Sequence, residues 1–211
     1  MAERLLLKQK NTKNQFYNMQ SILYIHGFNS AGNALKAKKL IEYFPDYEIV
    51  SPTLDYYTQS PDALIAQLRH EIDTHDIRMI VGTSLGGMMT MYMSALCGLK
   101  ALAINPASRP NESLRQFVGV ELINYATETK HYLSKEAFDA YQGFITGPFN
   151  DVHFDSEKLT FALAKDDELL GSYDSLKEQF RGFTIHEFDK VTHRFVKFEY
   201  LVPIIRDILE G

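Results

Sequence analysis

Cysteine is nearly absent from this chain, which has 211 residues and a single thiol, Cys97. One cysteine cannot form a disulfide within the chain, and it cannot supply the several thiolates of a structural zinc site. The HExxH pattern of zinc hydrolases does not occur in the sequence either. We therefore expect neither a disulfide framework nor a metal site.

Positive charge is also scarce. The chain has 22 Lys and Arg residues against 27 Asp and Glu residues, a formal net charge of −5, and it carries no basic block. A protein that follows a nucleic-acid backbone needs clustered positive charge to neutralise phosphates. This balance argues against nucleic-acid binding.

Long apolar runs are missing too, and none approaches the roughly 18 residues that a membrane span requires. Residues 1–20 are polar and rich in lysine, and their three-leucine run is shorter than the roughly 7–15 apolar residues of a signal-peptide core. We therefore predict no membrane span, a cytoplasmic protein and a polar N-terminal extension over residues 1–20. One hypothesis is that the functional protein begins near Met19, just before the first convincing strand.

What the chain does contain is an alternation of short apolar runs and amphipathic segments. The runs predict strands at 21–27, 47–52, 77–82, 101–105, 159–164 and 183–188. Apolar residues at helical spacing predict helices near 33–44, 60–72, 85–96, 172–180 and 195–209. Such alternation is typical of βαβ units. We predict one α/β domain over 21–211, with a mostly parallel sheet of about six strands flanked by helices.

Residues 108–157 interrupt this alternation with about fifty residues rich in Tyr, Phe, Asn and Glu. An unstructured loop of that length is uncommon inside a compact domain. We predict that this segment is an insertion of a few helices, forming a cap above the ends of the strands.

The segment Gly82-Thr83-Ser84-Leu85-Gly86 fits the pattern GxSxG between a predicted strand and a predicted helix. In a nucleophile elbow, this turn holds the serine in a strained conformation that exposes its hydroxyl. The glycines avoid collisions where strand and helix fold back together. We predict Ser84 as the nucleophile and the backbone N–H of Leu85, at the helix start, as one oxyanion donor. The alternative is a tight turn with a solvated serine.

A serine nucleophile needs a base, and the base needs an acid that orients it. In this fold the acid and then the histidine follow the serine along the chain. His193, between the last predicted strand and helix, is the predicted base. The acid should follow the fifth strand, where Asp167 fits the small-x-x-Asp spacing of related loops. The other acids that remain open are Asp166, Glu168 and Asp189.

A His-Gly turn follows the first predicted strand, at His26-Gly27. The loop at this place usually lends the second oxyanion donor. The donor would be the N–H of Phe28, with Asn29 as an alternative. We expect His26 to brace the loop by hydrogen bonding.

These landmarks together resemble a known family. The segments YIHGFNS, GTSLGG and INPASRP, the late DELL turn and the final HRF are similar to the α/β-hydrolase superfamily, and within it to the YqiA-type esterases, family UPF0227. The resemblance implies an α/β-hydrolase fold that cleaves carboxylic esters or acyl thioesters through an acyl-enzyme. It implies a small-molecule acyl substrate and no cofactor.

Candidate substrate contacts are Asn29 and three aromatic residues of the insertion, Tyr125, Tyr141 and Phe144. The aromatic residues can equally form the core of the cap itself. Two other functions stay open: a different acyl or C–C bond hydrolase, since one triad serves several chemistries, and a catalytically idle scaffold that acts as a binding protein. A dinucleotide site is disfavoured because HGFNSAG lacks the GxGxxG spacing.

Overall fold

The structure, a computed structural model, describes residues 19–170 and 173–211. The predicted N-terminal extension lies, up to residue 18, outside the described residues. The division of the chain into an extension and a single domain therefore stays a prediction.

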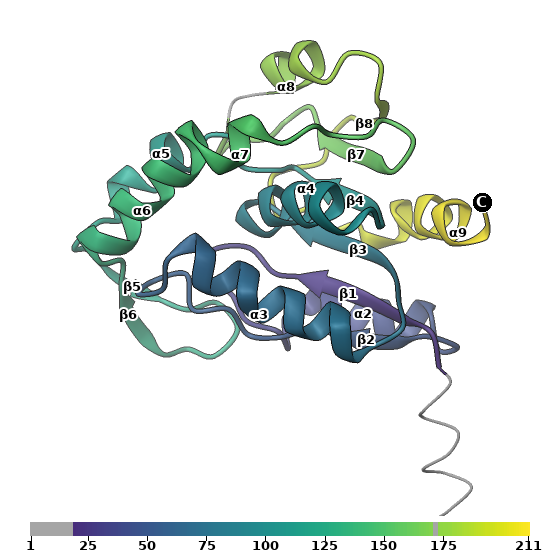
Figure 1. Ribbon diagram of the computed structural model, residues 1–211, viewed down its shortest axis with the longest axis horizontal. Coiled ribbons are helices and arrows are strands. Elements are labelled where there is room, and N and C mark those ends of the chain that lie inside the picture. The colour runs from purple at the N-terminus through teal and green to yellow at the C-terminus, as the bar shows by residue number, and fades with distance from the viewer. Residues whose placement is uncertain (1–18, 171–172) are drawn as a thin grey trace, which may run out of the picture.

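Six parallel strands form the central sheet, in the order β2-β1-β3-β4-β7-β8 (Figure 1). Their bounds are β1 Ser21–Ile25, β2 Glu48–Val50, β3 Ile77–Thr83, β4 Lys100–Ile104, β7 Leu159–Ala164 and β8 Thr184–Phe188. Side chains alternate between the two faces, so Leu23 and Ile25 enter one apolar cluster while Ile22 and Tyr24 enter another. The predicted parallel α/β sheet is confirmed.

Helices cover both faces of the sheet. On one face, the cluster around Leu23 includes side chains of α3 (Pro61–Thr74), α4 (Leu85–Cys97) and α8 (Tyr173–Gln179). On the other face, the cluster around Ile22 includes side chains of α2 (Leu35–Tyr43) and α9 (Val202–Glu210). The middle of the sheet is thus buried on both sides, which explains why the inner strands β1, β3, β4 and β7 are nearly continuous apolar runs.

The last helix differs from its prediction. A helix over 195–209 was expected, but the structure has a short 3-10 turn, η2 (Phe198–Tyr200), followed by α9 from Val202. Pro203 explains the difference, because its ring lacks an N–H and would collide with the carbonyl four residues earlier in a continuous helix. In the first turn of α9 the proline is tolerated.

The insertion is a mixed cap. Its elements are α5 (Pro110–Ser113), η1 (Arg115–Phe117), the antiparallel hairpin β5 (Glu121–Ile123) and β6 (Lys130–Tyr132), α6 (Lys135–Thr146) and α7 (Pro148–Asp151). The helices agree with the predicted cap, whereas the hairpin was not predicted. Phe144 of α6 packs edge-on against Tyr92 of α4, with ring centres 4.8 Å apart, and so anchors the cap on a helix that covers the sheet.

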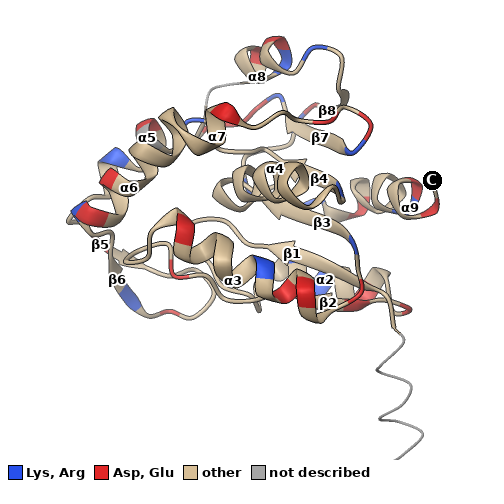
Figure 2. Cartoon of the chain, viewed as in Figure 1, with Lys and Arg blue, Asp and Glu red and all other residues tan. Residues whose placement is uncertain are grey.

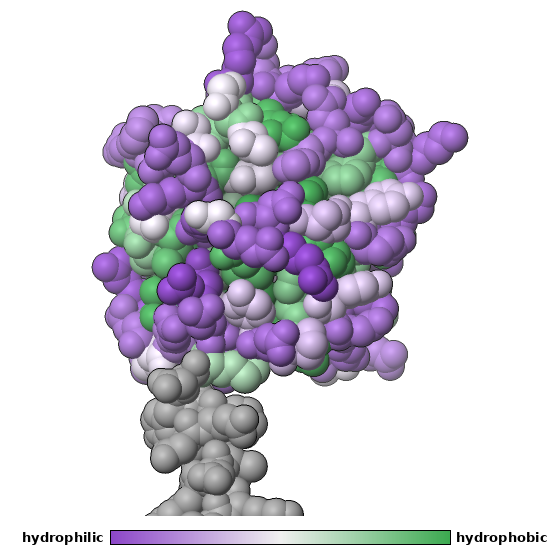
Figure 3. All heavy atoms as spheres, turned by 90° about the vertical axis from the view of Figure 1, so that its right-hand side faces the viewer, coloured by the Kyte–Doolittle hydropathy of each residue, from purple (hydrophilic) through white to green (hydrophobic). Residues whose placement is uncertain are grey.

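Charges of both signs are interspersed over the helices and loops (Figure 2). On the side that carries α9, hydrophilic side chains cover most of the surface, with apolar ones between them (Figure 3). None of the helices in the described part of the chain is both long and apolar enough to cross a membrane.

Candidate active site

Ser84 lies on a sharp turn between β3 and α4. Its backbone has φ 58° and ψ −122°, a conformation that non-glycine residues rarely adopt. The amide of Ser84 donates to the carbonyl of Ile104 (2.9 Å), and its carbonyl accepts from Ala107 (3.0 Å), so β4 and the loop after it hold the turn. The serine side chain does not cap α4, which leaves its half-buried hydroxyl available for other partners.

The two glycines around Ser84 allow strand and helix to meet. A Cβ on Gly86 would lie 2.2 Å from the carbonyl oxygen of Ile25, and a Cβ on Gly82 would lie 2.3 Å from the carbonyl oxygen of Gly86. Real Cβ atoms essentially never come so close to backbone atoms. The structure therefore explains both glycines of the GxSxG pattern by steric exclusion.

Asp167 and His193 form a buried pair from two loops, one after β7 and one after β8. Asp167 Oδ2 lies 2.7 Å from His193 Nδ1, and the two side chains are only 7% and 8% exposed. The second carboxylate oxygen, Oδ1, accepts from the amides of Leu169 (3.0 Å) and Leu170 (2.9 Å). Both oxygens of the carboxylate therefore have partners, which fixes its orientation.

The pKa of Asp167 lies below its ordinary value. Burial opposes ionisation, but the hydrogen bond and charge of His193 and the two backbone amides outweigh it. The carboxylate is therefore ionised at neutral pH and accepts hydrogen bonds only. Nδ1 of His193 must then carry the proton of this hydrogen bond, so that in the neutral tautomer of the ring Nε2 is the proton acceptor.

The other acids of the DDE turn contact backbone groups instead of the imidazole. Asp166 Oδ2 accepts from the amide of Lys190 (2.8 Å), and Glu168 Oε2 accepts from the amide of His193 (2.9 Å). Of the acids left open by the sequence, Asp167 is thus the one placed against the His193 ring, while Asp166 and Glu168 shape the loop that carries it.

Asn105, directly after β4, joins these loops and was assigned no role from the sequence. Its side chain is buried, with Nδ2 donating to the carbonyl of His193 (3.1 Å) and Oδ1 accepting from the amide of Ala164 (2.7 Å). The residue before it accepts the amide of Ser84. The end of β4 therefore ties the serine turn to the histidine loop. The INPASRP segment contained this residue, but only the fold reveals its partners.

The loop after β1 lies against the serine turn. A Cβ on Gly27 would lie 3.2 Å from Cβ of Ser84. His26 braces this loop, because Nδ1 donates to the carbonyl of Gly27 (2.8 Å) and Nε2 accepts from the amide of Leu54 (2.9 Å). Phe28 is half-buried, and its ring packs against Tyr57 at 5.3 Å. Leu85 is the first residue of α4, where backbone N–H groups have no partner within the helix.

The four predicted substrate contacts lie in different surroundings. Tyr141 and Phe144 are buried, at 0% and 4% exposure, among other cap and α4 side chains. Tyr125 is 69% exposed, and the Arg194 guanidinium lies over its ring at 4.5 Å. Asn29 is buried and hydrogen-bonded to the cap hairpin. Substrate contact by these four residues stays a prediction.

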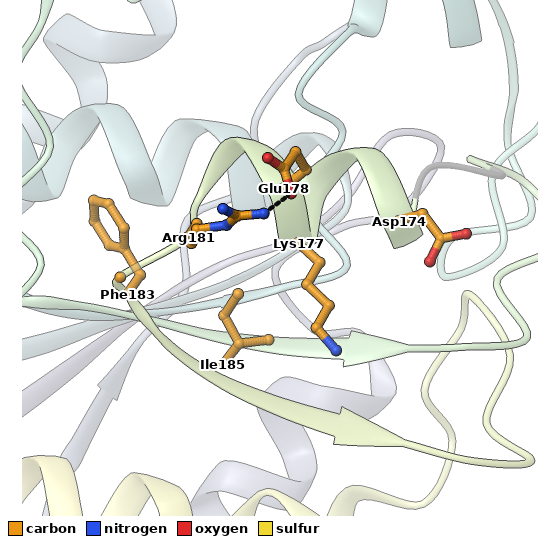
Figure 4. A pocket seen from close by; sticks show the side chains of 7 residues that line it. Asp174, Lys177, Glu178, Arg181, Phe183 and Ile185 are labelled. Carbon is orange, nitrogen blue, oxygen red and sulfur yellow. Dashed lines mark hydrogen bonds and ion pairs between the residues drawn. The ribbon is translucent and has the colours of Figure 1, made fainter.

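A surface groove lies apart from these loops, between α8 and β8 (Figure 4). Its lining mixes charges, with Arg181 paired to Glu178 at 2.6 Å beside Phe183 and Ile185. None of the predicted site residues lines this groove. Across residues 19–170 and 173–211, no group of three or more His, Cys, Asp or Glu side chains could hold a metal ion.

The sequence model of the Uncharacterised protein family (UPF0227) matches residues 21–210. The chain belongs to this family. A UPF0227 protein of Citrobacter koseri is 28% identical over 182 residues, which cover 82% of this chain and 90% of that relative. Against other UPF0227 relatives, from Yersinia, the chain spans about half of their length (54%) at 33% identity.

Solved structures with the same fold confirm the α/β-hydrolase architecture. Est1E from Butyrivibrio proteoclasticus has a TM-score of 0.66 at 16% identity, over 94% of this UPF0227 chain and 92% of the other. A monoacylglycerol lipase of Paleococcus ferrophilus also has a TM-score of 0.66, at 13% identity, over 90% of this chain and 93% of the other. At such low identities the likeness establishes the fold alone.

Proposed function

We propose that this protein is a serine hydrolase that cleaves carboxylic esters or acyl thioesters through an acyl-enzyme on Ser84. The observation that carries the proposal is the buried Asp167–His193 pair, 2.7 Å apart, in loops that β4 ties to the turn of Ser84. A buried acid that orients an imidazole, with a serine on an elbow, is the arrangement that generates a nucleophile at neutral pH. The fold shared with a monoacylglycerol lipase is consistent with this chemistry.

In the proposed acylation step, Ser84 Oγ attacks the carbonyl carbon of the substrate while His193 Nε2 takes the hydroxyl proton. The carbonyl oxygen becomes an oxyanion, which accepts hydrogen bonds from the N–H groups of Leu85 and Phe28. The tetrahedral intermediate then collapses: its bond to the leaving group breaks, and His193 returns the proton to the departing alcohol or thiol. Asp167 stabilises the imidazolium that exists between these events.

Deacylation repeats these steps with water. His193 takes a proton from water as the oxygen attacks the acyl carbon, and the same N–H groups stabilise the second oxyanion. Ser84 leaves with the proton from His193, and a carboxylic acid is released. No metal or redox partner is needed for either half of the reaction, because atoms and charges balance through the triad and water.

The test is labelling with a fluorophosphonate probe, which reacts with activated serines. Wild type should be labelled, peptide mapping should place the adduct on Ser84, and Ser84→Ala should lose it. Ser60→Ala is a matched control, because that hydroxyl caps α3 at the amide of Ala63 and lies outside the proposed site. A folded wild type that resists the probe would refute the nucleophile and favour the idle scaffold.

Substrate class requires a second measurement. A panel of p-nitrophenyl esters and acyl-CoA thioesters of increasing chain length should show turnover that is lost in Ser84→Ala. Labelling of Ser84 without turnover of any ester or thioester would instead favour a different acyl or C–C bond hydrolase.

A further inference from the structure

The β5–β6 hairpin of the cap is hydrogen-bonded to the loop after β1. The amide of Tyr125 donates to the carbonyl of Asn29 (3.1 Å), and Asn29 Nδ2 donates to the carbonyl of Ile123 (2.9 Å). Asn124 Nδ2 donates to the carbonyl of Ser30 (2.9 Å). The cap hairpin is thus held against the loop after β1 by both backbone and side-chain hydrogen bonds.

Tyr57, in the loop before α3, completes the contact. Its hydroxyl donates to Asn29 Oδ1 (2.7 Å) and accepts from Asn124 Nδ2 (3.1 Å). All three side chains are buried, with exposures of 5%, 6% and 3% for Tyr57, Asn29 and Asn124. We call these three residues the amide–tyrosine network.

The direction of every bond in this network is determined. Asn124 Oδ1 accepts from the amides of Ala126 (2.8 Å) and Thr127 (3.1 Å), so the other end of that side chain must be the donor. Asn29 Nδ2 meets a backbone carbonyl, so Asn29 Oδ1 must face the Tyr57 hydroxyl. Removing one member leaves buried polar atoms without partners, and such networks hold one geometry for that reason.

The network acts on a strained part of the loop. Asn29 has φ 57°, in the left-handed region that asparagine adopts more readily than most residues but less readily than glycine. Such a conformation persists where the surroundings over-determine it. Asn29 directly follows Phe28, whose N–H is the proposed oxyanion donor, and Gly27 of the same loop adjoins Ser84.

We propose that the amide–tyrosine network positions the loop after β1, which carries the proposed oxyanion donor. Tyr57 and Asn124 are then positioning residues for the hydrolase reaction. The inference rests on the proposed function, because it concerns how the donor at Phe28 is aligned. The cap would then contribute to rate as well as to substrate enclosure. Oxyanion stabilisation depends steeply on donor placement, and a displacement of about 1 Å can lower a rate about 100-fold.

The test is Tyr57→Phe, with Tyr132→Phe as its matched control. Tyr57→Phe keeps the ring, which stacks on His131 at 4.2 Å, and removes only the hydroxyl at the centre of the network. Tyr132→Phe removes a hydroxyl from the β5–β6 hairpin that the network contacts, where this hydroxyl donates to Glu121 on the exposed face. We expect kcat and the fluorophosphonate labelling rate to fall at least about tenfold in Tyr57→Phe, with KM little changed, and neither to change in the control.

Amide hydrogen exchange supplies a readout that does not depend on activity. The backbone of residues 26–30 should exchange faster in Tyr57→Phe than in wild type, and should be unchanged in Tyr132→Phe. Asn29→Gly is a second variant that accommodates the positive φ while deleting the side chain, and it should reproduce both effects. In the double variant Tyr57→Phe/Asn29→Gly the losses should not multiply, because the two changes break one network.

The outcomes separate this inference from the proposed function. Unchanged exchange and unchanged kcat in both single variants would overturn the inference while leaving Ser84 chemistry intact. A change in KM alone would also overturn it, since that result indicates substrate binding instead of donor alignment. A wild type that the probe never labels would refute the proposed function. Faster exchange of residues 26–30 in Tyr57→Phe would in that case still support the amide–tyrosine network as the structure that holds this loop.

Discussion

His26 gives the structure a built-in sensitivity to acid. The side chain is fully buried, and its ring both donates to the carbonyl of Gly27 and accepts from the amide of Leu54. Burial lowers the pKa of His26 from 6.5 to about 4, and the bond to Gly27 opposes this only in part. A proton on Nε2 would remove the acceptor that the amide of Leu54 needs. The folded state therefore requires a neutral His26.

The size of the stability loss at low pH follows from proton linkage at His26. Between pH 6.5 and pH 4 the unfolded chain binds a proton at this residue that the folded chain does not, so stability falls as the pH falls. Each pH unit inside this window removes at most about 1.4 kcal/mol, and the whole window removes about 3 kcal/mol. That loss is a substantial part of the roughly 5–15 kcal/mol by which domains are stable. Above pH 6.5 the contribution is fully present.

The assay is urea unfolding of wild type and His26→Gln at several pH values from 7.5 to 4. The variant should be less stable at pH 7.5, because an amide cannot reproduce both ring bonds, and the gap should narrow by about 3 kcal/mol towards pH 4. Tyr56→Phe is the control: it removes a hydroxyl that donates to the carbonyl of His26 (2.7 Å) but leaves the imidazole in place. It should lower stability at every pH by a similar amount. Parallel curves for wild type and His26→Gln would refute the reasoning.

Three further predictions concern the proposed triad, the elbow and a glycine of the cap helix α6. Asp167→Asn should lower kcat on a p-nitrophenyl ester by about 10⁴-fold with the fold intact, because a carboxamide no longer selects the Nδ1-protonated ring of His193. If steady-state kinetics showed a loss below tenfold, that result would contradict Asp167 as the acid of the triad. Gly86→Ala should destabilise by about 3 kcal/mol in urea unfolding, because its Cβ meets the carbonyl oxygen of Ile25 at 2.2 Å. Gly143 lies in helix α6, and a Cβ there would meet nothing within 4 Å. Gly143→Ala should therefore stabilise the folded protein by about 0.5–1 kcal/mol. Equal effects at both glycines would be incompatible with the steric explanation.

The sequence predicted those parts of the fold whose signal is local. The apolar runs located the four inner strands β1, β3, β4 and β7, because strands buried on both faces are nearly continuous in their hydrophobicity. The edge strands β2 and β8 are more polar and more exposed, and their predicted positions followed from shorter apolar runs. The elbow was recognisable because its glycines are steric requirements of one turn, and the chain order of the superfamily then directed attention to Asp167 and His193.

What the sequence did not predict depends on long-range partners. The strands β5 and β6 have three residues each, which is too short for the alternation over about four to eight residues that indicates a half-buried strand. Asn105 and Asn124 gave no signal either. A buried asparagine is distinguished by its partners, and the most distant of these lies 88 residues away for Asn105 and 94 residues away for Asn124.

The distribution of backbone strain connects these observations. Within the part of the chain that the structure describes, six non-glycine residues have positive φ: Asn29, Ser84, Asn105, Glu128, Lys190 and Phe195. The first three follow β1, β3 and β4, which are neighbours in the sheet, and Lys190 and Phe195 flank His193. Each such residue costs about 1–3 kcal/mol, so this pattern persists only where other interactions offset it.

Those offsetting interactions are visible at each of the three strand ends. The Ser84 amide bonds the end of β4, the Asn105 side chain bonds the β7 end and the histidine loop, and the Asn29 side chain bonds Tyr57 and the cap hairpin. A loop relaxed into ordinary backbone geometry would lose these bonds together with the placement of its N–H groups. The strain is therefore concentrated around the proposed nucleophile and the proposed oxyanion donors, and groups held in place before substrate arrives are what electrostatic stabilisation of a transition state requires. If the proposed function holds, the cap hairpin helps to position the proposed oxyanion donor, because its backbone bonds to Asn29 help to offset the strain there.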